Sequence, residues 1–544
     1  MAWNQLAAEL WTMIADECDE DGVRALCSPE MPPHIRDSAR PVQFRNLNFA
    51  AYNVLDKLDF NIDRYQFARS LAITQILSNR RFTELPKSPL VRHVRSWRYT
   101  GYLVHSPHPG ISKREKLIDL TMQFHVDKVW PLFLANLHLY VGLTRLALQN
   151  VVIDDVAVTS FNALDNLQSL EITHSIISCT TILRPFDRLT HYTQQEARGT
   201  FHVEFMMPVC STLTYLNVVI GTGDYRKLYS ALEQCHVLDA LSIYLIKEQG
   251  KAFECPPPGV DLSITACPNL SEYIGPAYYY AADIIPGRPL HTIKLNRLPC
   301  NAELVHPGCV EWIKVLFTSG TVPVEHFDVA QWPASALCAE ETFPTLFHKF
   351  PHLISLRIVI EPFEGTGNID FGDQLEAERW NTYNYLNILH TLSGPLPYKI
   401  PPTLRTLELV TEDEYERHPT HTFDKVVAAL RHSANFTNLR TLIVGTLYCF
   451  QRWTRLESGI WDVIHEGECF NLDGAEREHY SEFDDSSDNH GNVTEEEDTP
   501  EENQAKNSKE FSTSDEKTVQ TEGQKQDKSK VVFDNQDYRE LGAL

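Results

Sequence analysis

A short phrase of apolar residues recurs through this chain of 544 residues and limits its possible folds more than any other feature. It consists of an apolar residue, two variable residues, a second apolar residue, one variable residue and a third apolar residue. In a β-strand this alternation sends Leu146 and Leu148 to one side and Arg145 and Gln149 to the other. The ten copies begin at Leu143, Leu167, Leu213, Leu238, Leu270, Leu290, Val324, Leu353, Leu404 and Leu439, and the copy at Leu270 is poor.

One copy of the phrase cannot bury its apolar side without neighbours above and below it, so the copies predict a stack of strands. The phrase resembles the strand segment of leucine-rich repeats, whose units are about 20 to 29 residues long. This resemblance implies an α/β solenoid, in which short parallel strands and intervening helices or turns stack into an irregular leucine-rich-repeat horseshoe. The long intervals 167–213 and 353–404 each hold either two units or one unit with an insertion.

Several segments around the copies have predicted roles of their own. The polar or glycine-containing stretches 186–208 and 361–380 are expected to be loops within the array. We interpret 90–97 as an early strand and 126–140 as the helix before the first good strand.

The charge of the chain excludes some classes of partner. Its formal net charge is −25, and no basic stripe is present, so we expect no nucleic acid as a partner. An anionic membrane surface would also repel the chain.

The first residues and the cysteines bear on the compartment. No Lys or Arg precedes Arg24, and acidic residues interrupt the first apolar stretch, so a signal peptide is not expected. The longest apolar run, 129–143, is interrupted by polar residues and is shorter than the ~20 residues of a bilayer span. The twelve cysteines include no Cys-x-x-Cys pair and favour free thiols. We therefore expect a cytoplasmic or nuclear protein.

The N-terminal region is predicted to be helical. Apolar residues at intervals of three and four, from Leu6 through Leu10, Trp11 and Ile14 to Cys18, form one stripe of a helix. A second short helix fits 21–27, and the stretch 35–47 fits a helix that runs into an extended segment.

These N-terminal motifs resemble a known family. The pattern Leu6-x-x-Glu-Leu-Trp-x-x-Ile-Ala, then Val23-Arg-Ala-Leu, then Arg36-Asp-Ser-Ala-Arg-Pro-Val-Gln-Phe-Arg-Asn-Leu, is similar to the opening of F-box proteins, particularly the fungal set with leucine-rich repeats. The resemblance covers about the first 50 residues. It implies that the helices bind the adaptor subunit of a cullin-RING ubiquitin ligase and that the repeats bind a protein substrate, with the chain a monomer outside that complex. The residues expected to contact the ligase adaptor are Leu6, Leu10, Trp11, Ile14, Val23 and Leu26.

An alternative remains open at this point. An amphipathic helix at the end of a solenoid can serve as the polar-faced cap that such stacks require. The chain would then be a non-enzymatic interaction scaffold whose N-terminal helices only cap the repeats.

The sequence contains no local motif for catalysis. It lacks Gly-Lys-Ser/Thr, so it offers no phosphate-binding loop of that kind, and it lacks the Gly-x-Ser-x-Gly turn of serine hydrolases. We therefore predict no enzyme activity, no cofactor and no metal site.

The variable positions of the phrase are the predicted substrate-binding positions. They combine Tyr, Arg and charged residues, a mixture that suits a protein-binding surface. The residues expected on the concave face are Arg145, Gln149, Glu171, Tyr215, Asn217, Tyr244, Lys294, His326, Asp328, Arg357 and Glu408.

The predicted organisation has five parts. An F-box-like helical segment spans 1–50, and a transitional segment with early irregular repeats spans 51–142. The repeat array follows at 143–450, then a C-terminal cap at 451–470 that carries spaced aromatic residues. The remainder, 471–544, has 21 acidic and 8 basic residues, and a segment this polar and charged is expected to be disordered.

Overall fold

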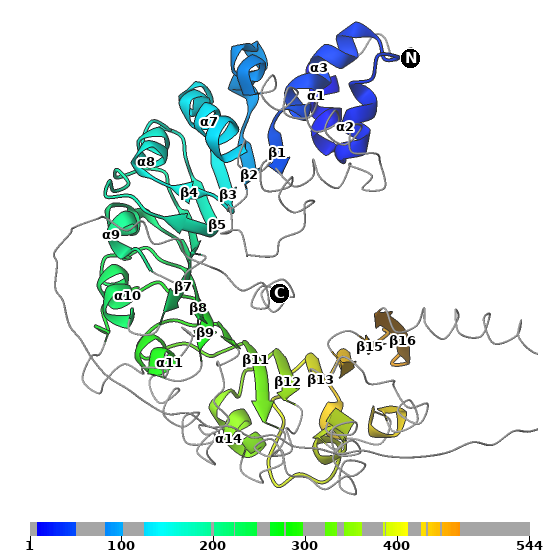
Figure 1. Ribbon diagram of the computed structural model, residues 1–544. Coiled ribbons are helices and arrows are strands. Elements are labelled where there is room, and N and C mark those ends of the chain that lie inside the picture. Colours follow the sequence, from blue (N-terminus) through cyan, green and yellow to red (C-terminus); the bar gives the residue numbers. More distant parts are fainter. Residues whose placement is uncertain are drawn as a thin grey trace, which may run out of the picture. The chain divides into compact units, whose positions relative to one another are not determined.

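The computed structural model describes the greater part of the chain between residues 8 and 467 (Figure 1). Leu6, the predicted tail 471–544, most of the transitional segment and nearly all of the predicted loop 361–380 lie outside the described residues. The described ranges are 8–50, 82–101, 125–196, 201–221, 224–246, 262–276, 279–296, 321–333, 342–361, 385–386, 388–411, 426–430, 434–446 and 449–467.

Each of the ten copies of the phrase forms a strand of one sheet, as predicted. The strands follow one another in chain order, and those from the copies run parallel, so the leucines of neighbouring copies align in register, as Leu356 does with Leu407. The ten strands are β3 (Arg145–Gln149), β5 (Ser169–Ile177), β7 (Tyr215–Gly221), β8 (Ala240–Ile246), β9 (Glu272–Pro276), β10 (Thr292–Asn296), β11 (His326–Pro333), β12 (Ser355–Glu361), β13 (Thr406–Thr411) and β14 (Thr441–Thr446).

Three further parallel strands were not recognised as copies of the phrase. These are β1 (Asn46–Ala50), β2 (Ser96–Thr100) and β6 (His191–Glu196). The prediction of a strand at 90–97 was therefore misplaced, because a 3₁₀ helix, η3 (Pro89–His93), occupies the first half of that stretch and β2 begins only at Ser96.

The two long intervals differ from each other. Strand β6 lies between β5 and β7, so the first long interval holds two units and the prediction of a loop at 186–208 was wrong. In the second, β12 pairs directly with β13, so one unit with an additional segment separates these strands.

The predicted C-terminal cap is a β-hairpin that extends the sheet. Strands β15 (Cys449–Arg455) and β16 (Trp461–Gly467) run antiparallel, and β15 pairs with β14. Trp453 on this hairpin is buried against the core. The short β4 (Val152–Ile153) pairs with β5 off the main path.

Helices cover one side of the strands, and the main core lies between the two layers (Figure 1). Strand residues such as Leu146 and Leu216 meet helix residues such as Phe133 and Leu228 there, all of them buried. This arrangement confirms an α/β solenoid-like architecture. The helical elements are η2 (Leu85–Lys87), η4 (His125–Val129), α7 (Trp130–Asn136), η5 (Leu137–Leu139), α8 (Asp155–Phe161), α9 (Val203–Met206), η6 (Met207–Thr212), α10 (Tyr225–Leu232), α11 (Tyr279–Ile284), α14 (Thr342–Lys349) and η8 (Ala434–Phe436).

The N-terminal helices pack on one another around a small core of their own. Helices α1 (Ala8–Glu17) and α2 (Glu20–Leu26) both contact α3 (Pro33–Gln43). Asp19 caps α2 by accepting a hydrogen bond from the Gly22 N–H at 2.8 Å. Pro33 opens α3, where a proline costs nothing because the first N–H groups of a helix lack internal partners. The buried apolar residues of this segment are Trp11, Ala15, Val23, Ile35 and Ala39, and none belongs to the main core.

Candidate functional site

All eleven predicted substrate-binding residues lie on the side of the strands that faces away from the main core. On β7, for example, Leu216 and Val218 are buried in the core, while Tyr215 and Asn217 alternate with them and are half-buried. We call the side of the parallel strands that carries these eleven residues the open face.

The parallel register brings four of the eleven into one row. Lys294, Asp328, Arg357 and Glu408 occupy matching positions on β10, β11, β12 and β13. Neighbouring strands lie about 4.8 Å apart, so each residue in the row stands beside a residue of opposite charge.

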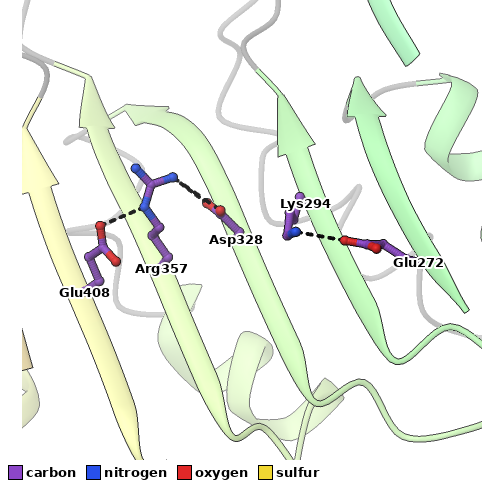
Figure 2. Close-up of polar contacts among 5 residues, drawn as sticks. All are labelled: Glu272, Lys294, Asp328, Arg357 and Glu408. Atoms are coloured by element: carbon purple, nitrogen blue, oxygen red, sulfur yellow. Dashed lines mark hydrogen bonds and ion pairs between the residues drawn. The ribbon is translucent and has the colours of Figure 1, made fainter. Parts of the chain in front are cut away.

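Ion pairs link members of this row to one another and to Glu272 on β9 (Figure 2). Arg357 donates from Nε to Glu408 Oε1 at 2.7 Å and from Nη1 to Asp328 Oδ2 at 3.2 Å. Lys294 Nζ lies 2.8 Å from Glu272 Oε1. We call Arg357, Asp328 and Glu408 the Arg357 group. All three side chains are about one-third exposed or less, so these pairs are partly shielded from water.

The electrostatics of the Arg357 group follow from one cation shared by two carboxylates. Burial opposes the charge of Arg357, but the adjacent Asp328 and Glu408 outweigh it and raise the pKa of the guanidinium. Burial also raises the pKa of the Asp328 carboxyl, Arg357 offsets only part of that effect, and the Glu408 charge adds to it. The group therefore carries one negative charge in excess.

Strands β6, β7 and β8 each place a ring on the open face, from His191, Tyr215 and Tyr244 respectively. The rings of His191 and Tyr215 stack with centroids 5.6 Å apart and an interplanar angle of 27°. Burial raises the pKa of the Tyr215 hydroxyl, and the nearby Tyr244 raises it further. The side chain of Tyr215 therefore stays neutral at physiological pH.

The remaining predicted residues are less engaged. Arg145 is exposed and Glu171 is half-buried, and neither forms an ion pair with any residue that the structure describes. Gln149 accepts a long hydrogen bond of 3.4 Å from Thr100 Oγ1. His326 lies exposed on β11.

The structure adds two residues to the open face: His191 on β6, a strand that was not recognised as a copy, and Glu272 on β9, the poor copy at Leu270. Their strands carry tyrosine as the second apolar residue of the phrase, Tyr192 in β6 and Tyr273 in β9, and both rings are fully buried. Each hydroxyl donates a hydrogen bond of 2.9 Å near the end of its own strand, to Gln194 Oε1 and to Pro276 O respectively. The third apolar position is also filled by other residues, Gln194 in β6 and Gly275 in β9, so the phrase is lost in β6 and poor in β9.

The residues predicted to contact a ligase adaptor fall into two groups. Trp11 is 3% exposed and Val23 is also buried, so both contribute to the core of the helical segment. Leu10 is 44% exposed, Ile14 and Leu26 are half-buried, and Leu6 lies outside the described residues.

An exposed apolar side of α1 includes one residue that was not predicted. Met13 is 62% exposed and follows Leu10 by three positions, and Ile14 follows Leu10 by four, so these side chains lie on one side of the helix. We call Leu10, Met13 and Ile14 the α1 patch.

Two other kinds of site are not found among the described residues. In the described ranges, no helix combines the length and apolarity needed to cross a bilayer. Within those ranges, no group of His, Cys, Asp and Glu residues is arranged to hold a metal ion. No protein-family model matches the chain, and a search of curated proteins finds no significant match.

Proposed function

We propose that this chain is the substrate-recognition adaptor of a cullin-RING (SCF-type) ubiquitin ligase. Helices α1 to α3 act as an F-box that binds the ligase adaptor subunit, and the open face of a leucine-rich-repeat horseshoe binds a protein substrate. The chain itself carries out no reaction and brings its two partners together.

The observation that carries the proposal is the separate core of the N-terminal helices. Trp11, Val23 and Ile35 are buried where these helices pack on one another, and none of the three belongs to the main core. A segment built in this way can present a docking surface without disturbing the strands behind it. The α1 patch is such a surface, because exposed apolar side chains on one side of a helix favour burial against a partner.

The open face supports the second half of the proposal. It gathers aromatic, charged and amide side chains from successive strands of one sheet, and surfaces of this composition suit protein partners.

The test is binding of the purified full chain to the purified ligase adaptor subunit, measured by calorimetry. Leu10→Asp places a charge in the centre of the α1 patch and should weaken binding at least tenfold, since a buried unpaired charge is costly. Leu10 is exposed enough for the helix to tolerate the change, whereas Trp11→Ala would remove part of the helical core.

Val156→Asp is the matched control, because Val156 is also an exposed apolar residue of a helix, on α8 and outside the helical segment. Binding should be unchanged in this variant. If the unsubstituted chain does not bind the adaptor subunit, or if Leu10→Asp binds as tightly, the ligase assignment is wrong.

A scaffold with capping helices is the second candidate, and two contacts favour it. Phe44, directly after α3, packs against the main core, and Arg45 forms an ion pair with Asp16 of α1. Removal of residues 1–45 distinguishes the candidates. A scaffold that loses its cap should unfold at a lower temperature, whereas an F-box protein should lose its partner and retain the stability of its array.

A further inference from the structure

The central strands of the open face combine stacked rings with carboxylates. Glu171 on β5, His191 on β6, Tyr215 on β7, Tyr244 on β8 and Glu272 on β9 share this stretch. We call these five residues the aromatic–acidic patch.

The strand register fixes how the members of the patch face one another. Tyr215 and Glu272 both align with Ala240 of β8, one from each side. They therefore stand about 9 to 10 Å apart across the sheet, with only a methyl group between them. His191 aligns with Tyr215 on its other side and stacks against it, which holds the Tyr215 ring in place.

The electrostatic environment of Tyr215 is consistent with this arrangement. Burial is the largest cause that raises the pKa of its hydroxyl; Tyr244, Glu272 and Glu171 raise it further, and a hydrogen bond with the Asn217 side chain offsets part of the rise. The two carboxylates and the second phenol are thus near enough to act on the ring electrostatically.

The patch retains unused capacity for a cation. Glu171 has no ion pair or hydrogen bond through its carboxylate among the described residues, and the exposed Arg145 on β3 does not pair with it. Glu272 uses Oε1 for Lys294 and leaves Oε2 for another donor. Two carboxylates with one lysine leave one negative charge.

We infer that the aromatic–acidic patch binds an arginine side chain of the protein held on the open face. The guanidinium stacks on the face of the Tyr215 ring opposite His191 and donates its N–H groups to Glu272, while Glu171, four strands away from Glu272, adds negative charge at longer range. This inference rests on the second half of the proposed function and names the chemistry of the partner.

Arginine fits this patch better than lysine does for two reasons. Its planar guanidinium stacks on an aromatic ring and carries donors in a fork that matches carboxylates, whereas the ammonium of lysine is a strongly hydrated point charge. The net charge of −25 on the chain also attracts a basic segment over longer distances.

The test uses the full chain and a fluorescein-labelled peptide, Gly-Ser-Gly-Arg-Gly-Ser-Gly, with fluorescence anisotropy at low salt. A second peptide replaces arginine by citrulline, which has nearly the same shape but no charge, and a third replaces it by lysine. The arginine peptide should bind about tenfold more tightly than the citrulline peptide, since it alone makes both the cation–π and the charge-assisted contacts.

Two variants locate the effect, and one serves as control. Glu272→Gln removes a carboxylate without removing volume, and Tyr215→Leu removes the ring; each should weaken arginine-peptide binding about three- to tenfold. His326→Ala changes an exposed residue of the open face outside the patch and should leave binding unchanged.

Equal affinity for the arginine and citrulline peptides would overturn the inference, as would equal affinity for the lysine peptide or unchanged binding in Glu272→Gln. Binding of the ligase adaptor and binding of the arginine peptide are measured separately, and Leu10→Asp affects only the first. If the adaptor does not bind but the chain still selects the arginine peptide, only the ligase assignment is wrong. If the adaptor binds but the chain does not select the arginine peptide, only this inference is wrong.

Discussion

Charged residues of the open face on β9 to β13 form ion pairs with one another, whereas the described charged residues on β3 and β5 do not. Arg357 bridges Asp328 and Glu408, and Lys294 pairs with Glu272. Arg145 and Glu171, at equivalent positions of the same repeated phrase, have no such partners among the residues that the structure describes.

The difference shows that position in the repeat does not decide what a charged residue does. Alternating signs on consecutive strands commit the charges of β10 to β13 to the stability of the sheet. On β3 and β5 the neighbours in register are small or neutral, Ala147 beside Glu171 and Ser169 beside Arg145. Charges in that stretch stay hydrated and free to meet a partner.

The largest expected effect comes from removing the central cation of the paired stretch. Arg357→Met leaves Asp328 and Glu408 half-buried without compensation and should lower the free energy of unfolding by about 1–3 kcal/mol. Urea denaturation measures this change. Arg145→Met is the matched control and should change stability by less than about 0.5 kcal/mol. Equal effects of the two substitutions would abolish the distinction between the stretches.

A second effect concerns pH. Because the pKa of Asp328 is raised in the folded protein, its contribution to stability is greatest below the ordinary value of about 4 and declines as the pH rises through the raised value. The stability of the unsubstituted chain relative to Asp328→Asn should therefore fall as the pH rises from about 4.5 to 7.

For Asp155, on α8, we expect the opposite dependence of stability on pH. Hydrogen bonds from Thr181 and Thr180 lower the pKa of its carboxyl, so its contribution is present above about pH 4 and is lost as the pH falls through the lowered value. Asp155→Asn should show the reverse trend in urea midpoints. The same trend in both variants would contradict the account of Asp328.

The smallest expected effect comes from removing Lys294, the ion-pair partner of Glu272. Lys294→Ala frees Glu272 and removes a competing positive charge, so arginine-peptide affinity should rise about two- to threefold, the size of an exposed ion pair. Anisotropy titrations measure the change, with His326→Ala as reference. Unchanged or weaker binding would show that Glu272 takes no part in the patch.

Much of the fold could be predicted, because one side of each strand must be apolar to fill a shared core. Every copy that was recognised from apolar residues at the phrase positions forms a strand. β6 escaped because Gln194 stands where an apolar residue is expected, and its burial depends on the hydroxyl of Tyr192, a tertiary detail. The antiparallel hairpin β15–β16 was also out of reach, since it depends on edge pairing with β14 rather than on the repeated phrase.

The candidate site was less accessible to prediction. Alternation along each strand placed all eleven residues on one face. Which charges pair depends on the register between neighbouring strands, and this register cannot be read from the sequence spacing. On α1, the apolar stripe does not tell which residues meet α3 and which remain outside. The stripe alone therefore does not predict that Trp11 is buried while Leu10 remains exposed.

The claim that the open face is where this chain holds a protein partner can be tested directly by photocrosslinking. A photoreactive amino acid is placed at Ala240, at the centre of the aromatic–acidic patch, or at Val156, exposed on α8. The fluorescein-labelled arginine peptide is then added and irradiated. We predict labelling of the chain from Ala240 and none above background from Val156. Equal labelling from both positions, or labelling from Val156 alone, would contradict the claim.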